Sequence, residues 1–149
     1  MKQRTQDREL SLPLEGGCLC KAVRYHLIGR PVDAGYCHCR LCQRAQGAPV
    51  VAWATFARAD FILLAGELRV YSSSASGRRT FCAACGTHLT FELTHSDVTT
   101  IDIALATLDD PEALRPEFHI WTSSQLSWFD TVDNLPRFSH DEPLGTVTS

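Results

Sequence analysis

The feature that most constrains this chain is a set of seven cysteines, which fall into three short groups. An odd number of cysteines cannot be fully paired within one chain, and a disulfide inside a Cys-x-Cys pair would close a strained ring. Groups with these spacings are typical of zinc sites, in which thiolates and imidazoles fill a tetrahedron. Structural zinc sites take four protein ligands and catalytic sites take three, so seven cysteines favour one site of each kind. The groups are Cys18 and Cys20; Cys37, Cys39 and Cys42; and Cys82 and Cys85.

The remaining composition narrows the classes of protein to consider. A length of 149 residues suits one domain. The charged N-terminal segment has no apolar core of the kind that secretory signals carry, which predicts a cytoplasmic location where disulfides are rare. No apolar run approaches the roughly 20 residues that cross a bilayer, so we expect no membrane association. A net charge of −3 argues against a nucleic-acid-binding protein.

The pattern of apolar residues predicts a mainly β fold, of sandwich or barrel-like type, with at most one or two short helices. Asp110-Pro111 predicts the start of one short helix, which Pro116 ends. Ala65-Gly66 predicts a hairpin between two short strands. Alternating or continuous apolar runs predict strands at 21–27, 50–56, 61–64, 67–71, 87–93 and 98–105, and an extended piece begins at 119.

The chain divides into a core domain and two flanking segments. Residues 1–13 are expected to be a flexible leader, and residues 14–131 the zinc-binding domain. Residues 132–149 contain two prolines and no periodic apolar pattern, so we expect a C-terminal tail.

Two of the cysteine groups have the geometry of half-sites. Cys82 and Cys85 can converge across a tight turn, and Gly86 can adopt the positive φ that such a turn needs. Cys18 and Cys20 lie two residues apart, so both would point to the same face of an extended strand. They could complete a closed site, although spacing alone does not decide which groups meet.

The third group puts three thiols within six residues, Cys37 to Cys42. A short extended piece followed by a tight turn can aim all three at one point. His38 would then point the opposite way from its cysteine neighbours, which leaves the fourth position of the tetrahedron open. The alternative is a closed zinc whose fourth ligand is His38, His88 or a residue of a neighbouring molecule.

These segments together resemble the glutathione-dependent formaldehyde-activating enzyme family, also called the centromere-protein-V type. The resemblance covers roughly residues 14–131, and all seven cysteines fall where the family has them. The segments that carry it are GGCLCKAVRY at 16–25, CHCRLCQR at 37–44, GRRTFCAACGT at 77–87, LDDP at 108–111 and PEFHI at 116–120.

The resemblance implies a fold and two metal sites. The family's fold is a β-tent of small antiparallel sheets arranged around zinc. By resemblance, Cys18, Cys20, Cys82 and Cys85 hold a structural zinc. Cys37, Cys39 and Cys42 hold a second zinc at the site of chemistry, so we expect two zinc ions per chain.

The resemblance also implies an activity, the joining of glutathione to formaldehyde or a related small electrophile. The product is S-hydroxymethylglutathione, and the enzyme is classed as a carbon–sulfur lyase. Glutathione would be the co-substrate, with its sulfur at the open position and its carboxylates bound by arginines; Arg40, Arg44 and Arg79 are the candidates. For His119, a place in the core or on the surface is favoured over a proton relay. The alternative function is a binding module in which both zinc ions are structural and the surface engages a protein partner.

Overall fold

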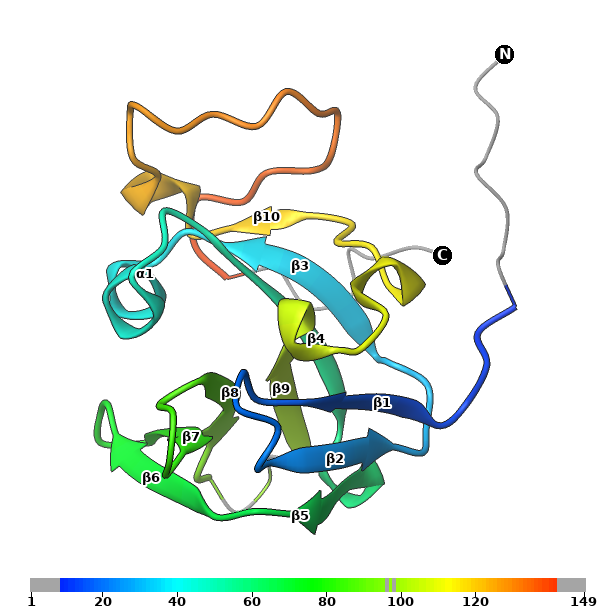
Figure 1. Cartoon of the computed structure of the whole chain (residues 1–149). Helices are drawn as coiled ribbons and strands as arrows, with labels where there is room; N and C mark the ends of the chain where they lie inside the picture. The colour runs from blue at the N-terminus through cyan, green and yellow to red at the C-terminus, as the bar shows by residue number, and fades with distance from the viewer. Residues whose placement is uncertain (1–8, 96, 98, 142–149) are drawn as a thin grey trace.

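The computed structural model describes residues 9–95, 97 and 99–141. Among these residues it has ten strands in two sheets and one short α-helix (Figure 1). The mainly β prediction is therefore confirmed. Parts of the expected leader (1–8) and tail (142–149), and Val98 in the last predicted strand, lie outside the described residues.

The smaller sheet has three antiparallel strands in the order β1-β2-β5. They are β1 (Leu14–Gly17), β2 (Arg24–Leu27) and β5 (Phe61–Ala65).

The larger sheet has seven strands in the order β10-β3-β4-β9-β8-β7-β6. All its neighbours are antiparallel except β10 and β3, which are parallel. Its strands are β3 (Asp33–Cys37), β4 (Val51–Ala57), β6 (Leu68–Ser72), β7 (Gly77–Cys82), β8 (His88–Leu93), β9 (Thr100–Ala104) and β10 (His119–Ile120).

Helical structure is limited to short pieces. The α-helix, α1 (Arg40–Gln46), follows β3 directly and ends at Gly47, whose φ of 61° is the left-handed conformation common after helices. None of the helices among the described residues has the length and apolar character needed to cross a bilayer. The single 3-10 turns are η1 (Arg58–Asp60), η2 (Leu105–Thr107), η3 (Pro111–Ala113) and η4 (Thr122–Ser124).

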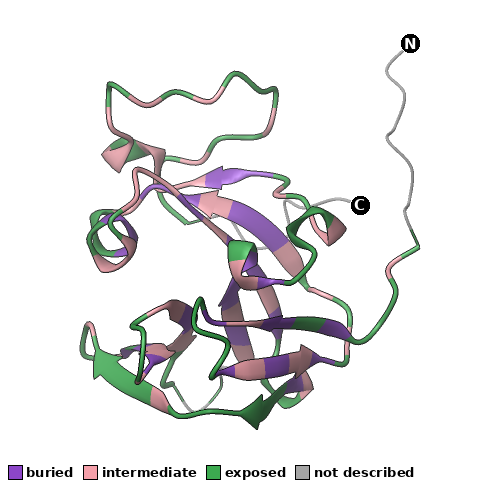
Figure 2. Ribbon diagram, viewed as in Figure 1, coloured by how far each residue is buried: buried purple, intermediate pink, exposed green. Residues whose placement is uncertain are grey.

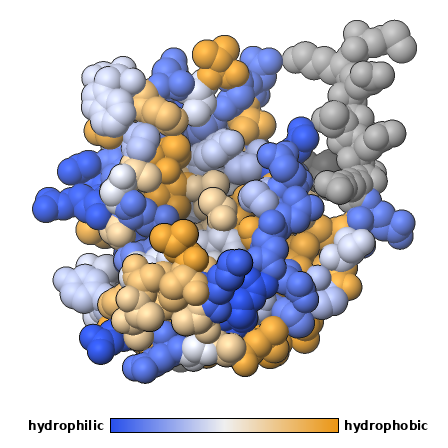
Figure 3. Space-filling model, in the orientation of Figure 1, coloured by the Kyte–Doolittle hydropathy of each residue, from blue (hydrophilic) through white to orange (hydrophobic). Residues whose placement is uncertain are grey.

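The main core lies where the two sheets face each other. Alternation along residues 23–27, which include β2, buries Val23, Tyr25 and Leu27, each 0% exposed, as the sequence pattern predicts. Phe56 of β4 and Leu89 of β8, both in the larger sheet, belong to the same core cluster. Figure 2 shows the buried residues on β1, β2, β3, β4 and β9, with β5 and β6 largely exposed. Three residues of β5, Ile62, Leu63 and Leu64, add to the apolar surface, and Figure 3 shows apolar and polar patches interspersed over one face of the molecule.

The predicted hairpin at Ala65-Gly66 is wrong. Strand β5 pairs with β2 in the smaller sheet, whereas β6 pairs with β7 in the larger one. Gly66 does take a positive φ, 88°, but a Cβ there would lie 2.5 Å from the carbonyl oxygen of Ala22. The glycine therefore serves a close approach of two backbone segments as the chain passes from one sheet to the other.

Other predictions match the structure in part. The predicted helix after Asp110 is the single 3-10 turn η3, and the Asp110 carboxylate accepts a hydrogen bond from the Glu112 amide at 3.1 Å. Strands β1, β3 and β7 and helix α1 were not predicted, because glycine, cysteine and charged residues occupy positions where an apolar periodic pattern needs apolar residues.

The described part of the 132–149 segment is attached to the larger sheet. The amide of His119 donates to the Pro136 carbonyl at 2.8 Å, and the amide of Phe138 donates to the His119 carbonyl at 2.9 Å. The Trp121 amide donates to the His140 carbonyl at 3.0 Å. Residues 136–140 thus run alongside β10 and the residues that follow it.

Candidate functional site

Four of the cysteines form one group, the four-cysteine cluster: Cys18, Cys20, Cys82 and Cys85. Their sulfur atoms all lie within 4.8 Å of one another. The Cys18 and Cys20 sulfurs are 3.5 Å apart, and those of Cys20 and Cys82 are 3.9 Å apart. Zinc–sulfur bonds of about 2.3 Å in a tetrahedron imply sulfur–sulfur edges of about 3.8 Å, so this donor set fits zinc.

The four-cysteine cluster joins two turns that are distant in sequence. Residues 18–20 follow β1, and residues 82–85 connect β7 to β8. The Val23 amide donates to the Cys18 sulfur at 3.2 Å, and two amides of the 82–85 turn donate to the Cys82 sulfur at 3.4 Å each. Such N–H···S contacts offset the negative charge that thiolate ligands bring.

The other three cysteines, Cys37, Cys39 and Cys42, form the three-cysteine cluster, with sulfur atoms within 4.8 Å of one another. Cys37 ends β3, Cys39 is the N-cap of α1, and Cys42 lies in the first turn of α1. The Cys39 sulfur accepts a hydrogen bond from the Cys42 amide at 3.3 Å. The expected extended piece is thus followed by a helix rather than by a turn alone, and the helix start directs the thiols to one point.

The electrostatics of the three-cysteine cluster favour a cation. Hydrogen bonds from the thiols of Cys37 and then Cys42, with a smaller contribution from the charge of Arg79, lower the pKa of Cys39 to about 2. The hydrogen bond with Cys39, then that with Cys42, and burial raise the pKa of Cys37. The cluster therefore holds a thiolate readily, and its three donors fit a zinc ion with three protein ligands.

A pocket of about 520 Å³ lies beside the three-cysteine cluster. This volume is within the range of about 300 to 1,000 Å³ that is usual for small-molecule sites. Its lining includes the three thiols with Arg40 and Arg79, and the carboxyl groups of Asp33, Asp102 and Asp141. The aromatic residues of its wall are Trp53, Phe91, Phe118 and Trp121.

Comparison with known proteins decides the family. The model of the family described as glutathione-dependent formaldehyde-activating enzyme matches residues 13–124. The chain belongs to this family. The resemblance in the cysteine segments is thereby confirmed.

Two individual proteins extend the comparison. An uncharacterized lyase of Schizosaccharomyces pombe is 32% identical over 81 residues, which cover 54% of this chain and 58% of that relative. A Rhodobacter sphaeroides protein of known crystal structure is 25% identical, with a TM-score of 0.53 over 68% of this chain and 91% of that chain. The second likeness supports the mainly β fold, and the first spans little more than half of the relative's length.

Within this member of the family, the three candidate arginines occupy different environments. Arg79 is 3% exposed, and both terminal nitrogens of its guanidinium point at the Cys42 sulfur, at 3.7 and 3.6 Å. Arg40 is exposed at the pocket, where it donates to the Gln43 side chain at 2.8 Å. Arg44 is exposed and does not line the pocket.

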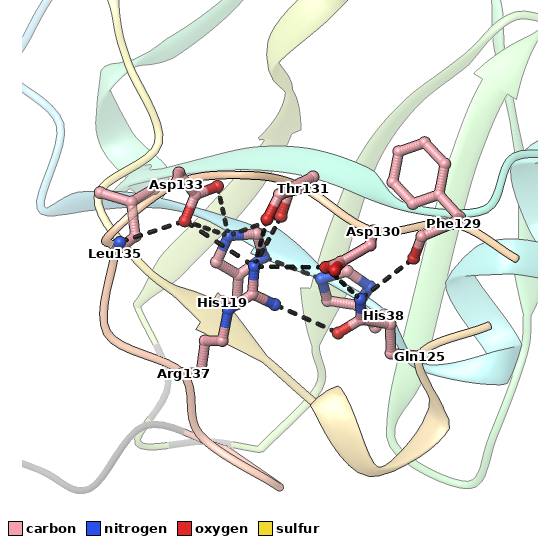
Figure 4. Close-up of polar contacts among 9 residues, drawn as sticks. All are labelled: His38, His119, Gln125, Phe129, Asp130, Thr131, Asp133, Leu135 and Arg137. Atoms are coloured by element: carbon pink, nitrogen blue, oxygen red, sulfur yellow. Dashed lines mark hydrogen bonds and ion pairs between the residues drawn. The ribbon is translucent and has the colours of Figure 1, made fainter. Parts of the chain in front are cut away.

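His38 does not join the three thiols, as the alternation of an extended segment predicts. It is fully buried, and its Nε2 lies 2.8 Å from Nδ1 of His119 (Figure 4). His119 is fully buried as well, and its Nε2 contacts the two carboxylate oxygens of Asp133 at 3.2 and 3.0 Å. His88, the other histidine considered as a fourth ligand, is not grouped with the thiols and stacks on Phe81 with ring centroids 5.8 Å apart.

Hydrogen bonds connect Asp133, His119 and His38 in a chain of side chains. The Asp133 carboxylate accepts from Nε2–H of His119, and Nδ1 of His119 shares a hydrogen bond with Nε2 of His38. Burial, with the nearby His119, lowers the pKa of His38 to about 4, so the ring is neutral at pH 7. The hydrogen bonds from Asp133 through His119 thus fix the position of His38, which lies between Cys37 and Cys39 in the sequence. Sequence reasoning missed Asp133, which lies in the expected tail.

Asp102 is a second residue that sequence reasoning missed. It lies on β9 between two buried isoleucines and lines the pocket, where it accepts a hydrogen bond from the Thr55 hydroxyl at 2.6 Å. Burial raises the pKa of its carboxyl from 3.8 to about 6. The folded chain therefore keeps a proton on Asp102 at a pH where the unfolded chain has released it.

Replacing Asp102 should change how stability depends on pH. Because the folded state binds more protons between pH 4 and 6, its stability falls as pH rises through that window. Asp102→Asn keeps an acceptor for Thr55 without the charge. We expect little change in unfolding free energy at pH 4 and a gain of up to about 3 kcal/mol at pH 7, measured by urea unfolding. The exposed Asp97→Asn is the control, and an equal effect of Asp102→Asn at both pH values would contradict the assignment.

Replacing His119 should loosen the segment that follows it. His119→Ala leaves the buried Nε2 of His38 without its partner, which should destabilise the fold by about 1–3 kcal/mol. Hydrogen exchange at the amides of 137–140 should accelerate, while exchange in β2 should follow only the global loss. Asp133→Asn retains an acceptor oxygen and should have the smaller effect. Unchanged exchange at 137–140 in His119→Ala would show that these residues are held independently of the histidine pair.

Proposed function

We propose that this chain is a zinc-dependent carbon–sulfur lyase of the S-(hydroxymethyl)glutathione synthase type. It would join glutathione to formaldehyde or to a related small electrophile. The observation that carries the proposal is the difference between the two clusters. All three members of the three-cysteine cluster line a pocket of about 520 Å³, whereas no member of the four-cysteine cluster lines that pocket. Membership of the family and the lyase name of the Schizosaccharomyces pombe relative support the same reaction class.

The two clusters would divide the metal sites between them. The four-cysteine cluster would hold a zinc with four protein ligands, which stabilises the fold, and the three-cysteine cluster would hold the second zinc. When bound there, zinc supplies a site that holds an added thiol in its deprotonated, nucleophilic form.

The reaction needs no oxidant or reductant. The glutathione sulfur forms a bond to the formaldehyde carbon while the carbonyl π bond and the S–H bond break. The thiol proton ends on the former carbonyl oxygen, which becomes the hydroxyl. The side chains of the pocket would supply orientation and exclusion of water. Arg40, exposed at the pocket, would contact a glutathione carboxylate, and the aromatic wall would pack on the tripeptide backbone. Arg44 does not line the pocket, so its position does not support a contact with glutathione.

The partners that follow from this function are small molecules. Glutathione and a reactive aldehyde occur in the reducing cytoplasm, where seven unpaired cysteines can persist. The proposal therefore includes a cytoplasmic enzyme that binds neither membrane nor nucleic acid.

Metal content and glutathione binding test the proposal together. The purified chain should contain about two zinc ions. Cys39→Ser should lower the content toward one with the fold retained, whereas Cys82→Ser should unfold the domain, because structural zinc contributes folding free energy directly. Calorimetric titration of glutathione should give heat with the wild type and none with Cys39→Ser.

Two outcomes would contradict the proposal. If both variants lose metal and remain equally folded, the four-cysteine cluster does not have the separate structural role that we propose for it. If the zinc-loaded wild type binds no glutathione, the alternative of a binding module with two structural zinc ions and a protein partner replaces the enzyme.

A further inference from the structure

Strand β7 carries two adjacent arginines in opposite environments. Successive side chains of a strand point to opposite faces, so only one of the pair can face the interior. Arg78 is exposed, whereas Arg79 is 3% exposed and lines the pocket. The chain therefore places one guanidinium where water cannot solvate it.

The contacts of the Arg79 guanidinium are unusual for a buried cation. Its Nε donates to the Ser73 hydroxyl at 3.1 Å, and its two terminal nitrogens face the Cys42 sulfur at 3.7 and 3.6 Å. The guanidinium carbon lies 4.8 Å from the centroid of the Phe91 ring, so an aromatic face lies against it. All three nitrogens are thus directed at Ser73 or at a cysteine of the three-cysteine cluster.

A buried guanidinium needs a negative partner, because arginine stays protonated and an unpaired buried charge is strongly unfavourable. None of the ion pairs found among residues 9–95, 97 and 99–141 involves Arg79. The three-cysteine cluster is the negative group that its terminal nitrogens contact. Arg79 is therefore placed as the counter-charge of the cluster.

The charge of the cluster explains why a fixed cation belongs there. One Zn²⁺ with three thiolates carries a net charge of minus one, and a fourth thiolate from a ligand would raise this to minus two. Such a charge is costly in a buried site lined by aromatic residues. A neutral fourth ligand would bring no such increase.

We propose that Arg79 is the residue that makes the three-cysteine site accept an anionic sulfur as its fourth ligand, in preference to a neutral donor. This inference rests on the proposed function and assigns its selectivity to one side chain. Arg79 acts on the sulfur ligands and not on the carboxylates of glutathione, because both terminal nitrogens already face Cys42. Arg79 thus acts by holding a positive charge beside the sulfur ligands. Arg40 remains the candidate for contact with a glutathione carboxylate.

The two possible roles of Arg79 make different predictions for small thiols. A residue that balances sulfur charge affects every thiol, including 2-mercaptoethanol, which has no carboxylate. A residue that clamps carboxylates affects glutathione and leaves 2-mercaptoethanol unchanged. The affinity for imidazole, a neutral donor, should not depend on the charge at position 79.

The experiment uses the full chain loaded with Co²⁺, whose absorption in the near ultraviolet reports the number of bound sulfurs. Each of the three probes is titrated into wild type, Arg79→Gln, Arg79→Lys and the exposed control Arg78→Gln. The spectrum of Cys39→Ser, which keeps the four-cysteine cluster, is subtracted. Circular dichroism verifies that each variant is folded, and Arg79→Lys supplies a charged variant if the glutamine variant does not fold.

Arg79→Gln should weaken the binding of glutathione and of 2-mercaptoethanol by the same factor, about tenfold or more, and leave imidazole binding unchanged. Arg79→Lys, which retains the charge, should recover most of the loss, and Arg78→Gln should behave as the wild type. A loss confined to glutathione would overturn the inference in favour of a carboxylate clamp. Thiol binding that is equal in wild type, Arg79→Gln and Arg79→Lys would overturn it while leaving the proposed function intact. Failure of the wild type to bind any thiol would overturn both.

Discussion

The close approach of four sulfur atoms joins the two sheets of this protein. The turn after β1 and the turn between β7 and β8 meet at the four-cysteine cluster, where the Cys20 and Cys82 sulfurs are 3.9 Å apart. A hydrogen bond from the Leu19 amide to the Thr87 hydroxyl, at 3.1 Å, joins the same two turns. The contact also has a consequence for the pocket, because β7 ends in Cys82 and carries Arg79 three residues earlier. Strand β7 thus contributes Cys82 to the four-cysteine cluster and places Arg79 against the three-cysteine cluster beside the pocket.

Local patterns were sufficient for the elements whose burial is one-sided. Strand β4 is an apolar run, and its predicted range, 50–56, lies within one residue of the observed bounds. Strand β2 has a clean alternation; its end was predicted correctly, but its start was placed at residue 21, three residues too early. Strand β7 was missed because its buried face carries Arg79 and a glycine in place of apolar residues. The hairpin at Gly66 was mispredicted because a glycine with positive φ indicates a change of direction and does not specify the next pairing partner.

The candidate site shows the same division between local and long-range information. Spacing predicted half-sites and a count of four plus three, the family resemblance supplied the pairing of the half-sites, and strand alternation was enough to turn His38 away from its neighbours. The partner of His38 was not predictable, since His119 lies 81 residues later in the chain and, with its own partner Asp133, approaches only in the folded protein. The contact of Arg79 with Cys42 likewise joins residues 37 positions apart in the chain, and no local pattern encodes it.

The two cysteine clusters differ in how far solvent reaches their sulfurs. In the four-cysteine cluster Cys20 and Cys85 are exposed, whereas in the three-cysteine cluster Cys37 and Cys42 are buried and Cys39 is half-buried. Peroxide and thiol-modifying reagents attack accessible thiolates first. Such reagents can therefore reach the junction of the two sheets directly from solvent, and a reaction there would disturb the fold as well as the metal site.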